Sequence, residues 1–458
     1  MNRVSKRASA LFLLIILLAG GLGYFVYEYF AKAETWVVTA GSPHIFNSNN
    51  IGCGQVVDRG GNLLLDITQK RTYAADLAVR RSTLHWLGDR QGRISAPAIA
   101  HYGREMTGYD LIDGLYSYTG AAGQAQLTLS SEVQKAALKA MGEHKGTIGV
   151  YNYRTGEILC AVTTPNYDPD DVPDIEGDTT GAYEGIYLNR FTQSTYIPGS
   201  IFKIVTTGAA LEYVDDILDR KFTCNGVYEY GIDKVSCERA HGKLTLKQAL
   251  ANSCNCAFGQ IANLVGAENL QSYVDQLQIT QPVKFDGITT ARGKFDLSEA
   301  AKVEIAWGGI GQYTDLINPC RYMTFMGVIA GGGKAAMPHL VEHVSLEGEN
   351  TYTAQTTYTD RVMNETTALI LQEYMRNNVA SVYGDGNFPG LTVCAKSGTS
   401  QLGGNQKSNA MFAGFVLDEA YPLAFIAVVE NGGYGASTCV PILSKVLSAC
   451  KNEMDVSG

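Results

Sequence analysis

The chain has 458 residues, of which 45% are hydrophobic and 18% are charged, so it can form one large core and a smaller module, and nothing in its composition indicates disorder. A formal net charge of −9, without any basic run that interleaves with aromatic residues, argues against nucleic acid as a partner. The ten cysteines include no Cys-x-x-Cys pair, and Cys254-x-Cys256 is too closely spaced for a zinc knuckle, so we expect no bound metal.

The N-terminal segment predicts a membrane anchor. Residues 1–7 carry three basic side chains, and no charged residue occurs from 8 to 27, which is enough for a helix of roughly 20 residues to cross a bilayer. Basic residues before the span place the N-terminus in the cytoplasm. A cleaved signal peptide is the alternative, but the apolar stretch is long and lacks a clear small-x-small cleavage site. We therefore favour a single-pass anchor over residues 1–30, with the remainder outside the cytoplasm.

Residues 31–125 have a mixed pattern, for which we expect a small α+β pedestal. A Gly-Gly turn between apolar runs predicts a hairpin over residues 55–66, and the pattern of residues 70–89 is partly helical. Small residues at 119–124 predict a linker to the rest of the chain.

Residues 126–458 have clearer patterns and form the third predicted domain. A helix should start at Ser130 or Ser131, and apolar strands over 147–153 and 157–163 predict a hairpin at the centre of a sheet. Further helices are expected at 204–211, on both sides of a break near 252–255, at 322–330 after a tight glycine loop at 308–312, at 366–378 and at 439–450. Strands over 391–399, 410–416 and 423–429 predict an antiparallel meander. We expect an α/β (α+β) fold, in which helices cover both faces of a central antiparallel sheet.

The segment around Ser200 contains the first candidate catalytic pair. A Pro-Gly turn leads into an apolar helix, so Ser200 and Lys203 lie one turn apart on the same face. A serine needs a base to act as a nucleophile, and Lys203 can be that base only when it is uncharged. Burial and a second cation such as Lys396 would favour the uncharged amine. Taken alone, Ser-x-x-Lys is better explained as a helix N-cap followed by a surface lysine.

Two further polar clusters could complete a site. Ser253-x-Asn255 falls at the break between two predicted helices. Ser253 could relay a proton to a leaving group, and Asn255 could hold a substrate amide because it both donates and accepts hydrogen bonds. Taken alone, the two residues could simply be polar residues that break a helix.

The third cluster, Lys396-Ser397-Gly398-Thr399, lies on a predicted strand. Lys396 with the hydroxyl of Ser397 or Thr399 could bind a substrate carboxylate, and Gly398 would let a substrate backbone come close. An oxyanion would lie between the backbone N–H groups of Ser200 and Thr399. A strand end and turn is the simpler explanation of this cluster on its own.

In this order and in these contexts, the three clusters resemble those of class B penicillin-binding proteins, a family of serine D,D-transpeptidases. The resemblance extends from about residue 126 to the C-terminus and includes Asn189-Arg190, His241-Gly242 and Gly311-Gln312. Over the pedestal it is faint, because Cys53-Gly54 stands where the family usually has Arg-Gly. The resemblance implies a penicillin-binding transpeptidase fold with an anchor and a pedestal but no glycosyltransferase domain.

The resemblance also implies a reaction. Ser200 would attack the penultimate D-alanine of a peptidoglycan stem peptide, terminal D-alanine would leave, and an amine from a neighbouring stem would form the cross-link. β-Lactams would acylate Ser200. The implied partners are stem peptides, β-lactams and, as a candidate, a shape or division glycosyltransferase. We expect no cofactor, and we expect the catalytic domain outside the cell membrane.

Other functions remain as alternatives. The motifs do not exclude a D,D-carboxypeptidase or a β-lactamase-type hydrolase, although the length and the pedestal favour transpeptidation. A β-lactam sensor would need several spans and a His-Glu-x-x-His motif, which the sequence lacks, and a scaffold would tolerate loss of Ser200 or Lys203. Cys224 and Cys237 flank a Gly- and Tyr-rich loop and could form a disulfide outside the cytoplasm, with two free thiols as the alternative.

Overall fold

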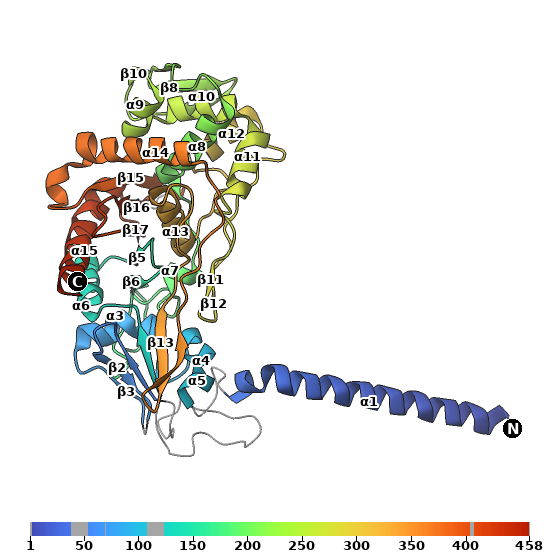
Figure 1. The fold of residues 1–458 in the computed structure, drawn as a ribbon. Coiled ribbons are helices and arrows are strands. Elements are labelled where there is room, and N and C mark those ends of the chain that lie inside the picture. The colour runs from blue at the N-terminus through green and yellow to red at the C-terminus, as the bar shows by residue number, and fades with distance from the viewer. Residues whose placement is uncertain (1, 38–53, 69, 108–122, 404–406, 458) are drawn as a thin grey trace.

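A computed structural model, drawn in Figure 1, describes residues 2–37, 54–68, 70–107, 123–403 and 407–457. Most of the predicted linker at 119–124, and Cys53, lie outside the described residues. The first helix, α1 (Asn2–Val37), contains 28 residues, Val4–Ala31, that are long and apolar enough to cross a membrane. The most apolar stretch of this helix is 0% buried within the described chain. Burial in a bilayer would remove that apolar surface from water.

The pedestal contains a six-stranded sheet in the order β14-β13-β4-β1-β2-β3. Its strands are β1 (Gln55–Val57), β2 (Leu63–Asp66), β3 (Thr72–Tyr73), β4 (Gln124–Leu127), β13 (Val341–Leu346) and β14 (Glu349–Thr353). The antiparallel β1–β2 pair confirms the predicted hairpin. Around the sheet lie α3 (Leu77–Leu87), within the segment predicted to be partly helical, α4 (Pro97–His101) and α5 (Gly103–Thr107). Because β13 and β14 come from far along the chain, a hairpin from beyond the predicted boundary at residue 125 forms one edge of this sheet.

The central sheet is antiparallel and has the order β15-β16-β17-β5-β6. Its strands are β5 (Gly146–Asn152), β6 (Ile158–Thr164), β15 (Val393–Ser400), β16 (Asn409–Val416) and β17 (Leu423–Val429), which confirms the predicted hairpin and meander. One expectation is wrong: β6 is an edge strand, not a central one. All of its residues are nevertheless buried, because α3 and α6 (Ser131–Met141) cover it, which explains its apolar sequence.

Helices cover both faces of this sheet, as predicted. Along β17, Leu423, Phe425 and Val429 pack with α6 and α15 (Gly435–Ser457), whereas Ala424 and Val428 pack with the opposite core. This alternation follows from the two-residue period of a strand. The opposite face is covered by α13 (Pro319–Ala330) (Figure 1). The final helix is longer than the predicted 439–450 at both ends.

The remaining helices form the part of the molecule at the top of Figure 1 and its connection to the sheet. They are α7 (Arg190–Gln193), η1 (Gly199–Phe202), α8 (Lys203–Tyr213), α9 (Leu246–Ala251), α10 (Asn255–Val265), α11 (Ala267–Gln276), α12 (Lys302–Gly309), α14 (Glu365–Asn378), η2 (Val379–Tyr383) and η3 (Asp385–Asn387). Short strand pairs join them: β7 (Phe222–Cys224) with β10 (Gly242–Leu244), β8 (Val227–Tyr230) with β9 (Asp233–Ser236), and β11 (Lys284–Phe285) with β12 (Ile288–Thr289). The predicted helix break at 252–255 is confirmed, but Gly308 and Gly309 end α12 instead of forming a loop.

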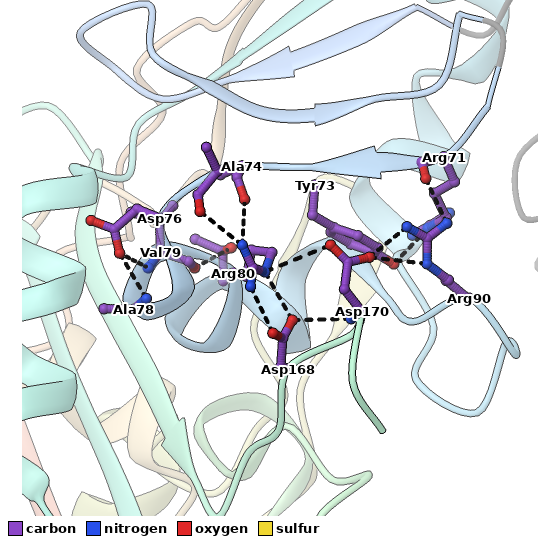
Figure 2. A network of polar contacts seen from close by, with 12 residues as sticks. Arg71, Tyr73, Ala74, Asp76, Ala78, Val79, Arg80, Arg90, Asp168 and Asp170 are labelled. Carbon is purple, nitrogen blue, oxygen red and sulfur yellow. Dashed lines mark hydrogen bonds and ion pairs between the residues drawn. The ribbon is translucent and has the colours of Figure 1, made fainter. Parts of the chain in front are cut away.

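An arginine–aspartate network joins α3 of the pedestal to the loop after β6 (Figure 2). Arg80 makes two parallel bonds to Asp168, with Nε 2.8 Å from Oδ1 and Nη2 2.7 Å from Oδ2. Its Nη1 also donates to the carbonyl of Ala75 at 2.8 Å. Arg90 forms an ion pair with Asp170 two residues further along. Such fork-like pairing fixes direction as well as distance, so it holds the pedestal against the central domain.

Candidate active site

The turn before Ser200 is fixed by close backbone packing. Gly199 has a φ of +54°, and a Cβ there would lie 2.5 Å from the carbonyl oxygen of Thr399, so the position requires glycine. Its N–H donates to the carbonyl of Gly311 at 2.9 Å. The hydroxyl of Tyr322 donates to the carbonyl of Ile201 at 2.8 Å. These contacts hold η1 against the end of β15 and place Ser200 at the start of a helical turn.

Lys203, one turn later, points back at Ser200 as predicted. Its Nζ lies 2.9 Å from Ser200 Oγ, and it lies 2.7 Å from the carbonyl of Ser253 and 2.6 Å from Asn255 Oδ1. The side chain is fully buried, and the ring of Phe258 lies 5.7 Å from the nitrogen. Each of its hydrogen-bonding partners is neutral, so no carboxylate among them stabilises a charge on the amine.

The surroundings lower the pKa of both lysines. Burial, followed by the nearby charge of Lys396, lowers the pKa of Lys203 to about 7, and burial lowers the pKa of Lys396 to about 7. A neutral Lys203 has two N–H donors and one lone pair. The donors match the two shortest contacts, to Ser253 and Asn255, which leaves the lone pair for the hydroxyl proton of Ser200.

Ser253 lies in the break between α9 and α10, where it connects the two lysines. Its Oγ is 3.2 Å from Nζ of Lys203 and 3.1 Å from Nζ of Lys396. Ser253 has a φ of +51°, in the left-handed region that non-glycine residues seldom occupy. Strained backbone of this kind is concentrated at functional sites. Asn255 faces Lys203 with its carbonyl oxygen, while its Nδ2 donates to the carbonyl of Ser236 at 2.9 Å.

The strand β15 brings the third cluster to the same place. Lys396 is fully buried and donates to the carbonyl of Ser397 at 2.8 Å in addition to contacting Ser253. The Ser397 hydroxyl lies 2.9 Å from the hydroxyl of Tyr383, and Thr399 Oγ1 accepts a bond from the backbone N–H of Gly435 at 3.1 Å. Lys396 therefore points toward Ser253, whereas the two hydroxyls are held by η2 and by the start of α15.

The structure shows a packing role for Gly398 that the sequence did not predict. A Cβ there would lie 2.9 Å from the carbonyl oxygen of Pro198 and 3.0 Å from Cγ2 of Ile201. The glycine thus allows β15 to pack on η1, and the backbone that approaches it is the protein's own. A side chain at this position would push the strand away from the turn that carries Ser200.

The structure also adds residues that the sequence did not single out. Tyr383, almost buried in η2, accepts a hydrogen bond from the N–H of Ser397 at 2.9 Å and contacts the Ser397 hydroxyl, so it orients that side chain. Phe258 forms one wall of the site of Lys203. A tyrosine in an irregular helical turn and a phenylalanine in a helix carry no local signal for a site, because only the tertiary fold brings them there.

Comparisons with known proteins agree with this geometry. Residues 146–448 match the family model described as the penicillin binding protein transpeptidase domain. The peptidoglycan D,D-transpeptidase PbpA of Mycobacterium tuberculosis (strain H37Rv) is 26% identical over 392 residues, which cover 78% of each chain. Among solved structures, the D,D-transpeptidase domain of a peptidoglycan glycosyltransferase from Eggerthella lenta aligns with a TM-score of 0.75 and 25% identity over 89% of this chain and 99% of that one. Penicillin-binding protein A from M. tuberculosis, in a ceftriaxone acyl-enzyme complex, aligns with a TM-score of 0.75 and 23% identity over 87% of this chain and 98% of that one.

Proposed function

The chain belongs to the penicillin-binding protein transpeptidase family, and from that premise we propose how its residues perform peptidoglycan D,D-transpeptidation. The protein is a serine-type D,D-transpeptidase that cross-links stem peptides through an acyl-enzyme and is acylated by β-lactams. In our proposal Ser200 Oγ attacks the carbonyl of the penultimate D-alanine, and terminal D-alanine leaves with the proton taken from Ser200. An acceptor amine then attacks the ester, and Ser200 recovers a proton as the cross-link forms.

The observation that carries this proposal is the buried amine beside Ser200. Nζ of Lys203 lies 2.9 Å from Oγ, within reach for a direct proton transfer. With two N–H bonds directed to Ser253 and Asn255, the lone pair faces the hydroxyl. A pKa of about 7 leaves a large fraction of the amine uncharged at neutral pH, which a general base requires.

Ser253 is the proposed route by which the proton reaches the leaving group. Its hydroxyl lies within 3.2 Å of Nζ of Lys203 and within 3.1 Å of Nζ of Lys396, so it can accept a proton from one side while donating its own. The charge on Lys396 would keep Lys203 neutral before attack and balance the oxyanion afterwards.

Thr399 is the proposed contact for the terminal carboxylate of the substrate. Its oxygen already accepts a bond from Gly435, so the hydroxyl proton is left to donate to a carboxylate. Ser397, oriented by Tyr383, and the positive charge of Lys396 would add to this contact, and Gly398 keeps the strand close enough for it. The backbone N–H groups of Ser200 and Thr399 would stabilise the oxyanion, each worth roughly 3 kcal/mol of the barrier.

We also propose the arrangement of the chain at the membrane. Residues 1–30 form a single-pass anchor, residues 31–125 the pedestal region and residues 126–458 the transpeptidase domain, which lies outside the cytoplasm. The exposed apolar surface of α1 and the basic residues in its first two turns support this orientation. The pedestal, between the membrane and the catalytic domain, is the proposed contact for a shape or division glycosyltransferase.

Acylation of Ser200 is tested with a fluorescent penicillin. The wild-type protein should form a covalent adduct that survives denaturation, and Ser200→Ala should form none. Ser298→Ala, which changes an exposed serine outside the polar cluster, is the matched control and should label like the wild type. An adduct on Ser200→Ala at the wild-type rate would show that another residue is the nucleophile.

A donor and acceptor pair of stem-peptide mimics then separates transfer from hydrolysis. Cross-linked dimer should be the main product when the acceptor amine is present. Free acid as the sole product at saturating acceptor would instead identify a carboxypeptidase.

A further inference from the structure

Four side chains next to the active site bring metal-ligating atoms together. Cys224, Cys237, His241 and Cys254 each offer one ligand atom, and all of these atoms lie within 4.8 Å of one another. Cys224 ends β7, Cys237 follows β9, His241 precedes β10, and Cys254 is the N-cap of α10. The loop between residues 224 and 241 therefore closes on the start of α10. Figure 1 shows β10 and α10 together at the top of the molecule.

Two of the distances between ligand atoms match a tetrahedral site, and all of them lie within 4.8 Å. With zinc–sulfur and zinc–nitrogen bonds of about 2.3 Å and about 2.0–2.1 Å, a tetrahedron separates two sulfurs by about 3.8 Å and a sulfur from a nitrogen by about 3.6 Å. The Sγ atoms of Cys237 and Cys254 are 3.7 Å apart, and Cys224 Sγ is 3.4 Å from His241 Nδ1. A disulfide would join only two of these groups and would leave another thiol and the imidazole without a role. The structure has Cys224 and Cys237 as free thiols, in agreement with the second of the two alternatives from the sequence.

Backbone N–H groups point at two of the sulfurs. The N–H of Cys256 donates to Cys237 Sγ at 3.3 Å, and the N–H of Ala257 donates to Cys254 Sγ at 3.4 Å. Helix N-caps are usually serine, threonine, aspartate or asparagine, because a neutral thiol accepts hydrogen bonds weakly. A thiolate bound to a metal at the positive end of α10 would accept them well.

The hairpin beside these ligands is held by few buried side chains. Most residues of β8 and β9 are exposed, and Ile232 at their turn is 100% exposed, while Val235 anchors β9 in the core. A two-stranded hairpin on this scale is marginal in water. A metal ion that joins the base of the hairpin to β7, β10 and α10 would supply the missing constraint.

We propose that Cys224, Cys237, His241 and Cys254 bind one Zn²⁺ ion and that this site positions Ser253 and Asn255. Three sulfurs and one imidazole favour zinc among the common divalent ions, and four protein ligands leave no open position, so the site is structural. Each thiol that binds as a thiolate releases its proton to solvent. The sequence interpretation, which expected no metal, relied on Cys-x-x-Cys spacing, but here the ligands come from three separate turns.

Two of the proposed metal ligands are next to catalytic or supporting residues in the chain. Cys254 lies between Ser253 and Asn255 in the chain, and Cys237 follows Ser236, whose carbonyl accepts the bond from Asn255 Nδ2 at 2.9 Å. The four ligands are therefore positioning residues, because they hold the loop whose atoms contact Lys203. This effect on acylation rests on the proposed function, whereas metal binding does not.

The metal is tested on the full chain purified in detergent without chelator. Elemental analysis should find one zinc per chain, and Cys224→Ala and His241→Ala should each lose it. Cys256→Ala is the matched control, since its thiol faces the carbonyl of Val235, and it should keep the metal. Absence of zinc from the wild type after incubation with Zn²⁺ and dialysis overturns the proposal, as does a disulfide among these cysteines in the intact mass. Loss of zinc from Cys256→Ala but not from His241→Ala would also overturn it.

Wild-type protein provides a second test that does not depend on whether the variants fold. After removal of zinc by a chelator, addition of Co²⁺ should produce the strong visible absorption of cobalt bound by thiolates in a tetrahedral site. Acylation by fluorescent penicillin should slow about tenfold or more without metal and recover when zinc returns. An unchanged acylation rate in metal-free protein would overturn the positioning role. If the wild type is never acylated, the proposed function fails, while the metal content still decides the site.

Discussion

The cations at the catalytic centre and those at the contact between the pedestal and the central domain differ in the groups that surround them. At the catalytic centre, Lys203 and Lys396 are fully buried, and the hydrogen-bonding partners of Lys203 are neutral. At the contact between the pedestal and the central domain, Arg80 is 16% exposed and meets the carboxylate of Asp168 with two bonds (Figure 2). Burial without a counter-charge lowers the pKa of Lys203 to about 7, whereas Arg80 holds the pKa of Asp168 below its usual value.

The difference lies in the choice of residue as well as in its partners. A guanidinium stays charged and forms a fork that matches a carboxylate, so it suits a permanent structural link. A lysine amine can lose its proton when it is desolvated, so it suits proton transfer. The protein places the cation that must remain charged beside an aspartate, and the cation that must become neutral beside another lysine.

Removing the amine at the catalytic centre should have the largest effect. Lys203→Ala should slow acylation by fluorescent penicillin by about 10²–10⁴-fold, because a general base contributes this much. Lys203→Arg should be similarly slow, because arginine keeps its charge and offers no lone pair. Near-ultraviolet circular dichroism checks that both variants fold. Lys284→Ala, at an exposed lysine, is the control and should acylate normally. A mere twofold loss in both variants would remove Lys203 as the base.

The pH dependence of acylation tests how far Lys396 lowers the pKa of Lys203. Protonation of Lys203 removes its lone pair, so acylation should fall about tenfold per pH unit below a midpoint of about 7, and it should fall again at higher pH as Lys396, whose pKa is also about 7, loses its charge. Lys396→Met removes the neighbouring cation, which is the second cause of the lowered pKa of Lys203, and should move the midpoint to higher pH. The rate of acylation measured from pH 5 to pH 10, about the range in which both forms are populated, gives both midpoints. An unmoved midpoint in Lys396→Met would show that burial alone sets the pKa of Lys203.

Removing the ion pair between Arg80 and Asp168 should have the smallest of these effects. Arg80→Ala should lower the free energy of unfolding by about 1 kcal/mol at neutral pH, since solvent reaches part of this pair and screens it. Asp168 has a lowered pKa in the folded state, so its contribution exists above the unfolded pKa and is lost as pH falls through the folded pKa. The difference between wild type and Arg80→Ala should therefore shrink in acid. Urea unfolding of both proteins at neutral pH and in acid measures this difference in unfolding free energy.

Acylation provides the control for this prediction. The midpoint of the acylation profile should be the same in Arg80→Ala as in the wild type, because Arg80 contacts none of the catalytic residues. Arg220→Ala, at an arginine whose ion-pair partner Asp216 is 57% exposed, should cost less stability than Arg80→Ala. An equal loss of unfolding free energy in the two variants would mean that the two hydrogen bonds from Arg80 to Asp168 contribute no more than an exposed ion pair does.

Local patterns explain why much of the fold could be predicted. Ser200 and Lys203 are three residues apart on a turn, so their proximity follows from helix geometry. The strands β16 and β17 are apolar runs separated by a short loop, and such runs pair as their sequence indicates. The apolar content of β6 was misleading about its position, because helices bury an edge strand as fully as a central one.

Long-range packing explains what the sequence did not predict. Gly398 packs on η1, which is close in space but distant in sequence, so this packing role carries no local signal. Tyr383 reaches Ser397 from an irregular turn that carries no motif. The cluster of Cys224, Cys237, His241 and Cys254 has no regular spacing, so a search for pairs of cysteines dismissed it.

The sequence by itself determined the order of strands and helices in the catalytic half, the anchor-like N-terminus and the identity of the three polar clusters, because periodicity and short motifs are local properties. Only the tertiary structure decided that Lys203 is buried among neutral partners, that Ser253 lies between two lysines, and that four zinc-type ligands meet beside them. The reason is that the pKa of an amine and the geometry of a metal site depend on groups that only the folded chain brings within a few ångströms.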